Sequence, residues 1–166
     1  MNQAIDSFCH LSPIQQGMLF HYLGGADAGV DIEQITVDYP EPVDAAAIRA
    51  AWEAEIGRQP VLRTAFRWKD VLAPLQEIHS RVELEWTAYD WSSQPEEESE
   101  RAFEAHAQQD RNRGFDLVAP PLMRVALFLL GTEHYRMLWT FHHILIDGPS
   151  FVTILEEVDE LYEPQG

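Results

Sequence analysis

The chain has 166 residues and a formal net charge of −17 at pH 7. This length suits one domain with a hydrophobic core, and the hydrophobic content of 46% excludes a disordered chain. The acidic charge excludes nucleic acid as an expected partner, because phosphate binding needs a basic surface. The single cysteine, Cys9, excludes an internal disulfide and a cysteine-based metal cluster.

Membrane and export signals are absent from the sequence. The first residues lack the basic region and apolar core of a signal peptide. No segment approaches the roughly 20 apolar residues that a membrane-spanning helix needs. We therefore expect a cytoplasmic protein without membrane attachment.

The first half of the chain predicts two helices and a strand, preceded by an N-terminal stretch without a predicted element. A helix is expected over 12–23, because Ser12 and Gln15 form a capping box and Pro13 suits the first helical position. Alternating side chains predict a strand over 32–39. A second helix is expected over 44–56, ended by Gly57.

The second half predicts further strands, a long helix and a hairpin. Strands are expected over 61–68, 75–79 and 82–88. A helix follows up to Arg113, with Ser92, Ser93 and Pro95 at its start and three glutamates in its first turn. Two apolar segments, 122–130 and 134–143, predict a hairpin, and a last helix is expected over 149–162. Together these elements predict a single α+β domain, with helices packed on one face of a mixed or antiparallel β-sheet.

The chain's most informative pattern is His-His-x-x-x-Asp-Gly, made by His142, His143, Asp147 and Gly148 at the exit of the last predicted strand. Side chains alternate along a strand, so the two imidazoles should point to opposite faces. That geometry argues against both of them binding one metal ion, and we predict no metal site. It fits one reactive histidine in a cleft and one packed histidine beneath it.

Three motifs, in this order, resemble condensation domains of nonribosomal peptide synthetases, within the chloramphenicol acetyltransferase-like superfamily. Residues 11–21 resemble the opening helix motif of that family, and residues 58–66 resemble its second motif. The His-His-x-x-x-Asp-Gly pattern resembles the family signature. The resemblance implies that residues 1–166 form the N-terminal lobe of a two-lobed domain, with no counterpart of the second lobe.

The resemblance also implies a reaction and its partners. Family members form an amide bond between two substrates carried as thioesters on the phosphopantetheine arms of carrier proteins, and no cofactor is expected to bind directly. Residues 139–151 should form one wall of the substrate cleft and leave an apolar surface exposed. We expect a second lobe, or self-association, to cover that surface.

Each motif residue receives a role from the resemblance. His143 matches the catalytic histidine, either as a general base towards the amine or as a group that positions it. His142 is expected to be packed inside the lobe, and Asp147 to form a buried ion pair with Arg63 that fixes the turn. Gly148 would permit a backbone conformation or a substrate approach that a side chain would block.

Two other functions remain open from the sequence. The chain could be a non-catalytic module of the same fold that recruits carrier proteins or a partner enzyme. It could also be an epimerisation domain, which shares the two histidines, although the residues of the first motif (11–21) and residues 149–151 argue against this.

Overall fold

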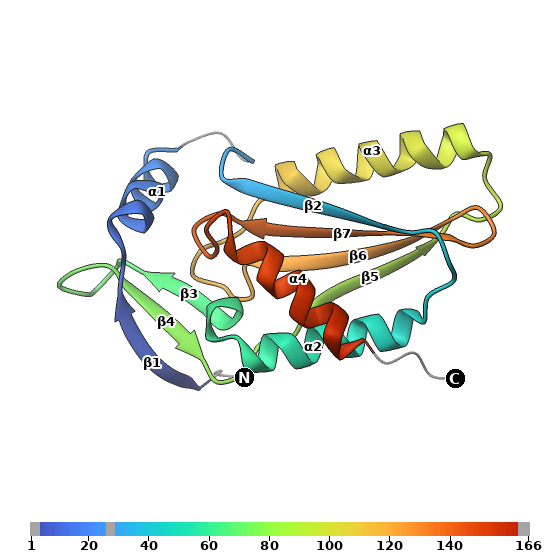
Figure 1. The fold of residues 1–166 in the computed structure, drawn as a ribbon. Coiled ribbons are helices and arrows are strands. Elements are labelled where there is room, and N and C mark those ends of the chain that lie inside the picture. Colours follow the sequence, from blue (N-terminus) through green and yellow to red (C-terminus); the bar gives the residue numbers. More distant parts are fainter. Residues whose placement is uncertain (1–3, 26–28, 163–166) are drawn as a thin grey trace.

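The computed structural model describes residues 4–25 and 29–162 (Figure 1). The elements follow in the order β1 (Ile5–His10), α1 (Pro13–Leu23), β2 (Ile32–Tyr39), α2 (Ala45–Arg58), the 3-10 turn η1 (Pro60–Arg63), β3 (Thr64–Arg67), β4 (Leu75–His79), β5 (Glu85–Asp90), α3 (Glu96–Arg113), β6 (Met123–Leu130), β7 (His134–His142) and α4 (Ser150–Leu161). None of the helices in this described part of the chain is long and apolar enough to span a membrane.

The larger sheet carries four strands in the order β2-β7-β6-β5. Strands β6 and β7 form the predicted antiparallel hairpin, and β2 pairs antiparallel with β7 so that Ile32 lies opposite His142. Strand β5 runs parallel to β6. The sheet is therefore mixed, and the predicted α+β class is confirmed.

Helices cover both faces of this sheet rather than the one face that we expected. On one face, Trp139 of β7 packs against Trp52 of α2 in a tilted arrangement with 4.9 Å between ring centroids, and α4 joins the same core. On the other face, Phe128 of β6 packs against Phe103 of α3 (Figure 1). The physical reason is visible in β6, whose residues are apolar at nearly every position and can be buried on both sides.

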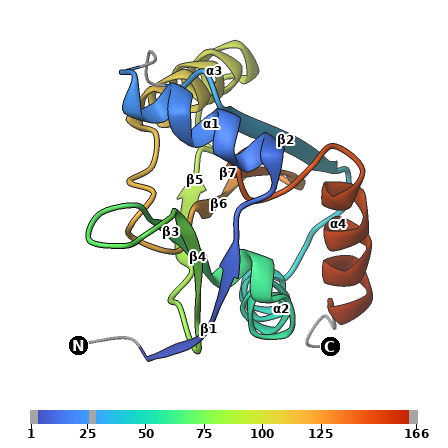
Figure 2. The same ribbon diagram turned by 90° about the vertical axis from the view of Figure 1, so that its left-hand side faces the viewer.

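The smaller sheet has the order β1-β4-β3 and lies next to α1 and α2 (Figure 2). Its strand β1 was missed in the sequence, because most of its side chains are exposed and no apolar alternation marks it. Backbone pairing with β4, rather than side-chain burial, holds it in place. The smaller sheet therefore lies at the same end of the lobe as α1, which carries the first sequence motif (Figure 1).

Three predicted boundaries shift. Helix α2 continues through Gly57 to Arg58. Pro60 then begins a 3-10 turn, so strand β3 starts at Thr64 rather than at residue 61. Strand β5 begins at Glu85 rather than at residue 82. In the connection between β4 and β5, buried Val82 and Leu84 alternate with exposed Glu83, which is why this segment resembled a strand.

Candidate active site

The two motif histidines stand where β7 ends and a loop leads to α4. The backbone here is fixed by hydrogen bonds: the His143 N–H donates to the Asp31 carbonyl at 2.8 Å, and the Leu145 N–H donates to the His142 carbonyl at 3.0 Å. The Ile144 N–H donates to His142 Nδ1 at 3.1 Å. The sequence after β7 therefore forms a defined turn and not a loose connection.

His142 is buried, with 4% of its surface exposed. Its Nδ1 accepts the Ile144 N–H, so the ring proton of the neutral form sits on Nε2. Burial lowers the pKa of His142 to about 4, with a smaller contribution from His143, while Asp31 opposes the shift. His142 is therefore a neutral imidazole at physiological pH that holds the turn.

His143 lies on the opposite side and lines a cleft of about 870 Å³. Its Nδ1 is buried, and within the described residues it has no hydrogen-bond partner. The predicted arrangement of one packed and one cleft-facing histidine is confirmed. His143 also borders a second hollow of about 140 Å³, together with Glu33, Ile35 and Phe151.

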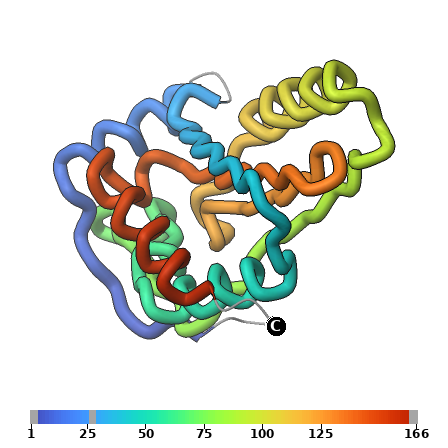
Figure 3. The backbone as a smooth tube through the Cα atoms, turned by 45° about the vertical axis from the view of Figure 1, so that its right-hand side comes forward, coloured from blue at the N-terminus to red at the C-terminus, as the bar shows by residue number. Residues whose placement is uncertain are grey.

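The cleft beside His143 is built from three parts of the chain that are distant in sequence. Its walls are the start of α1, the connection from α2 to η1, and the histidine loop with the first turns of α4. Figure 3 shows how the chain turns back after β7 and brings the start of α4 towards α1. The lining residues outside the motif are Ser12, Ile14, Gln15, Met18, Gln59, Val61, Ser150, Thr153 and Ile154. Sequence reasoning had assigned Ser12 and Gln15 only to helix capping.

The predicted ion pair between Arg63 and Asp147 is wrong. Arg63 is buried and turns away from the histidine loop: its Nε donates to the Ile56 carbonyl at 3.1 Å, and its guanidinium also reaches the His79 carbonyl and Asp6. Asp147 is exposed and accepts a hydrogen bond from the Ser150 hydroxyl at the start of α4. Arg63 therefore braces the smaller sheet against α2, whereas Asp147 belongs to the entry of α4.

Gly148 has no close neighbour that would exclude a side chain. A Cβ placed on it would meet nothing within 4 Å, and its backbone is not in the positive-φ region. The lobe itself therefore does not require glycine at this position. Close approach of a substrate remains our prediction for Gly148, which borders both the cleft and the smaller hollow.

The expected exposed apolar wall over residues 139–151 is only partly present. Trp139 and Phe141 are fully buried in the core, with 0% and 2% of their surfaces exposed, because α2 covers this face of the sheet. The wall of the cleft starts at His143 instead. Large exposed apolar side chains lie on α1, where Ile14 and Phe20 are both more than two-thirds exposed.

Comparison with known proteins decides the family. The model of the Condensation domain family matches residues 5–165. The chain belongs to the condensation domain family. It is 36% identical over 158 residues to gramicidin S synthase 2 of Brevibacillus brevis, a match that covers 95% of this chain and 4% of that protein. Tyrocidine synthase 2 of Brevibacillus parabrevis is 32% identical over 160 residues, or 96% of this chain and 4% of that protein.

Solved structures confirm the fold of the condensation domain lobe. The starter condensation domain of rhizomide synthetase RzmA matches with a TM-score of 0.83 and 21% identity, over 96% of this chain and 41% of that chain. A four-domain nonribosomal peptide synthetase bound to AMP and glycine matches with a TM-score of 0.80 and 22% identity, over 100% of this chain and 13% of that chain. The chain thus spans less than half of these structures and a few per cent of its curated relatives.

Proposed function

We propose that residues 1–166 supply the histidine-bearing lobe of a condensation site, in which an amide bond forms between two carrier-bound substrates. The observation that carries this proposal is the position of His143: it opens into the cleft from a backbone held by hydrogen bonds, while its neighbour His142 is buried and neutral. A cleft-facing imidazole on a rigid support suits proton transfer near neutral pH.

The reaction requires two thioesters to meet in the cleft. The amine of the acceptor aminoacyl thioester attacks the carbonyl carbon of the donor acyl thioester and gives a tetrahedral intermediate. The C–S bond of the donor then breaks, its carrier thiol leaves with a proton, and the new amide remains on the acceptor carrier. His143 would either take the proton from the amine or hold the amine in line for attack.

The phosphopantetheine arms of the two carrier proteins would bring the substrates, so no directly bound cofactor is required. One lobe forms only part of the site, since alignment of two thioesters needs walls on both sides. A second lobe would face the cleft and the exposed side chains of α1. Residues 1–166 would therefore be one part of the enzyme, and the second lobe would be a required partner.

The test compares two histidine variants in residues 1–166 joined to the second lobe of a related condensation domain. Amide formation is measured with an acyl-loaded donor carrier and an aminoacyl-loaded acceptor carrier. We expect His143→Ala to lower the rate by about 10²-fold or more, which is the usual contribution of general acid–base catalysis. His134→Ala is the matched control, because His134 is a partly exposed histidine at the far end of the same strand, where it contacts Asp38 and not the cleft.

Retention of the full rate by His143→Ala would contradict the proposal. Carrier binding by the joined protein without any amide formation would instead support the non-catalytic docking module. If His143→Ala lowers the rate, the pH dependence of that rate separates the two roles of His143, since a general base loses activity when it is protonated.

A further inference from the structure

We infer that Gln15 is a positioning residue for His143, because its side-chain amide ties the histidine loop to α1 and to the smaller sheet. This inference rests on the proposed function of His143. It assigns to the first sequence motif a role in the site that lies beyond helix capping. The two residues are brought together by the fold, since the contact joins Gln15 to a residue 129 positions away.

Every hydrogen-bonding position of the Gln15 amide is used. Its Nε2 donates to the Ile144 carbonyl at 3.1 Å and to Gln76 Oε1 at 3.2 Å. Its Oε1 accepts the Ser12 N–H at 2.9 Å and a hydrogen bond from Gln76 Nε2 at 3.1 Å. A primary amide has two donor hydrogens and two acceptor lone pairs, so this side chain has no capacity left for another partner.

These partners also fix the orientation of the amide. Turning it by 180° would place its NH₂ group against the Ser12 N–H and its oxygen against the Ile144 carbonyl. Both new contacts would be repulsive, and both original partners belong to the backbone and cannot rotate. Gln15 therefore acts as a directional link: its oxygen caps α1, and its nitrogen holds the histidine loop.

The held carbonyl belongs to the residue next to His143. The Ile144 N–H is bound by His142 Nδ1 and its carbonyl by Gln15, so the peptide units on both sides of Ile144 are fixed. His143 has no side-chain partner of this kind at its buried Nδ1 within the described residues. The backbone that Gln15 and His142 hold therefore sets the direction of the Cα–Cβ bond from which the His143 imidazole enters the cleft.

Gln76 carries the link into the smaller sheet. It lies on β4, exchanges two hydrogen bonds with Gln15, and its Nε2 also donates to the His10 carbonyl of β1 at 3.1 Å. The smaller sheet, which lies outside the cleft lining, is thus connected to the histidine loop through one amide pair. We assign it the role of a brace for the cleft.

The substitution Gln15→Glu separates the two tasks of the side chain. Glutamate at the third helical position completes a capping box as well as glutamine does, so the bond from the Ser12 N–H is kept. A carboxylate has no hydrogen to donate, so the bond to the Ile144 carbonyl is lost and replaced by repulsion. Gln16→Glu is the matched control, since it introduces the same charge one residue along α1, at an exposed position outside the cleft. It also removes an amide donor, whose partner is the Leu11 carbonyl at 3.3 Å and not the histidine loop.

The experiment uses residues 1–166 joined to the second lobe of a related condensation domain, with loaded donor and acceptor carriers. We expect Gln15→Glu to lower kcat by about 10-fold or more with little change in the KM for either carrier, because a displaced catalytic group slows the chemical step. Hydrogen exchange over residues 142–148 should become faster in this variant, while exchange over α1 stays as in the unchanged protein. Gln16→Glu should leave kcat, the KM for either carrier and hydrogen exchange over residues 142–148 unchanged.

Acid pH provides a rescue that depends on the hydrogen bond donated by residue 15 to the Ile144 carbonyl. When the introduced carboxyl is protonated, its O–H can donate to the Ile144 carbonyl again. The ratio of the kcat of Gln15→Glu to that of the unchanged protein should therefore rise as the pH falls through the pKa of this carboxyl.

Two results would overturn the inference. One is an unchanged kcat together with unchanged hydrogen exchange over residues 142–148 in Gln15→Glu. The other is a raised KM with unchanged kcat, which would make Gln15 a substrate-binding residue instead. Failure of the proposed function is recognised separately: His143→Ala would then keep its activity, while the exchange measurement would still report whether Gln15 holds the loop.

Discussion

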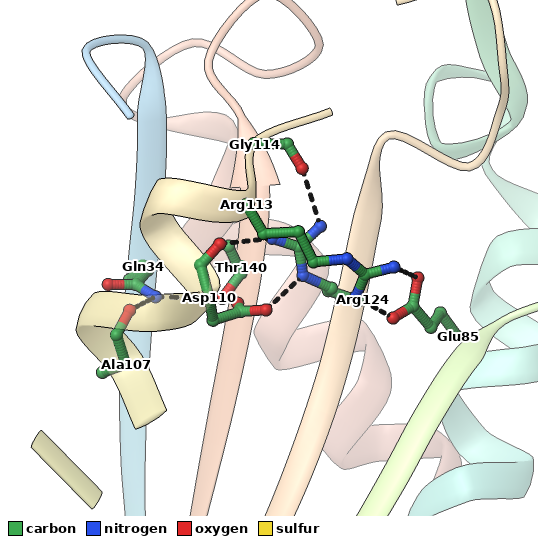
Figure 4. Close-up of polar contacts among 8 residues, drawn as sticks. All are labelled: Gln34, Glu85, Ala107, Asp110, Arg113, Gly114, Arg124 and Thr140. Carbon is green, nitrogen blue, oxygen red and sulfur yellow. Dashed lines mark hydrogen bonds and ion pairs between the residues drawn. The ribbon is translucent and has the colours of Figure 1, made fainter. Parts of the chain in front are cut away.

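Arg124 of β6 forms a buried ion pair with Asp110 of α3, and its loss should destabilise the lobe strongly (Figure 4). The side chains of the two residues are 7% and 10% exposed. Arg124 also donates to the Gly114 carbonyl at 3.0 Å and to the Asp110 carbonyl at 2.6 Å, and its guanidinium lies 4.1 Å from the Phe115 ring centroid. One arginine therefore neutralises a buried carboxylate and binds the last carbonyls of α3.

The substitution Arg124→Ala removes these contacts and leaves the Asp110 carboxylate buried without its partner. Breaking a buried pair in this way costs about 3–5 kcal/mol in the free energy of unfolding. The control is Arg113→Ala, which breaks the neighbouring pair of Arg113 with Glu85. Both side chains of that pair are about half exposed, and such surface pairs contribute about 0–1 kcal/mol. Urea unfolding followed by tryptophan fluorescence would measure both variants.

The double variant Arg124→Met with Asp110→Leu tests the reasoning further. It removes both charges and refills the space with apolar side chains, so it should lose clearly less stability than Arg124→Ala. An Arg124→Ala variant within about 1 kcal/mol of the unchanged protein would refute the reasoning. A double variant as unstable as the single one would also refute it, because the cost would then not come from the unpaired carboxylate.

Three further predictions concern the core and the pH dependence of stability. Trp52→Ala should lower the free energy of unfolding in urea by about 3–5 kcal/mol, because this fully buried ring packs against Trp139; a cost near zero would contradict the core described above. Because the pKa of His142 is lowered to about 4 in the folded lobe, the unfolded chain binds a proton there at a higher pH than the folded lobe does. The free energy of unfolding should therefore fall as the pH drops from about 6.5 to 4. His142→Asn should remove up to roughly 3 kcal/mol of that pH-dependent loss, and an identical pH profile in the variant would count against it. Burial and the neighbouring Glu157 raise the pKa of Glu55 to about 6, so this group loses stability for the lobe as the pH rises from about 4.5 to 6; Glu55→Gln should therefore melt at a higher temperature than the unchanged protein above pH 6 but not below pH 4.5.

Local signals in the sequence were sufficient for most of the larger elements. The capping box of Ser12 and Gln15 forms as predicted, with the Gln15 N–H donating to the Ser12 hydroxyl at 3.2 Å. The acidic first turn and basic last turn of α3 gave its limits, and two apolar runs gave the β6–β7 hairpin. These features depend on residues within a few positions of each other, so they can be read without the fold.

Features that depend on distant residues were missed or misassigned. Strand β1 is held by backbone pairing with β4, about 70 residues later, and its own side chains give no signal. The partners of Arg63 follow from how β4 packs against α2, which motif positions do not reveal. The link from Gln15 to Ile144 also exists only after α1 and the histidine loop have met.

The most direct test of the central claim is amide formation by residues 1–166 with and without a second lobe added in trans. Loaded donor and acceptor carriers are supplied in both reactions, and the condensed product on the acceptor carrier is measured by mass spectrometry. We predict no product from residues 1–166 alone, and product that depends on His143 once the second lobe is added. Turnover of both carriers by the strictly monomeric chain alone would contradict the claim that the cleft beside His143 is one part of a two-lobed site.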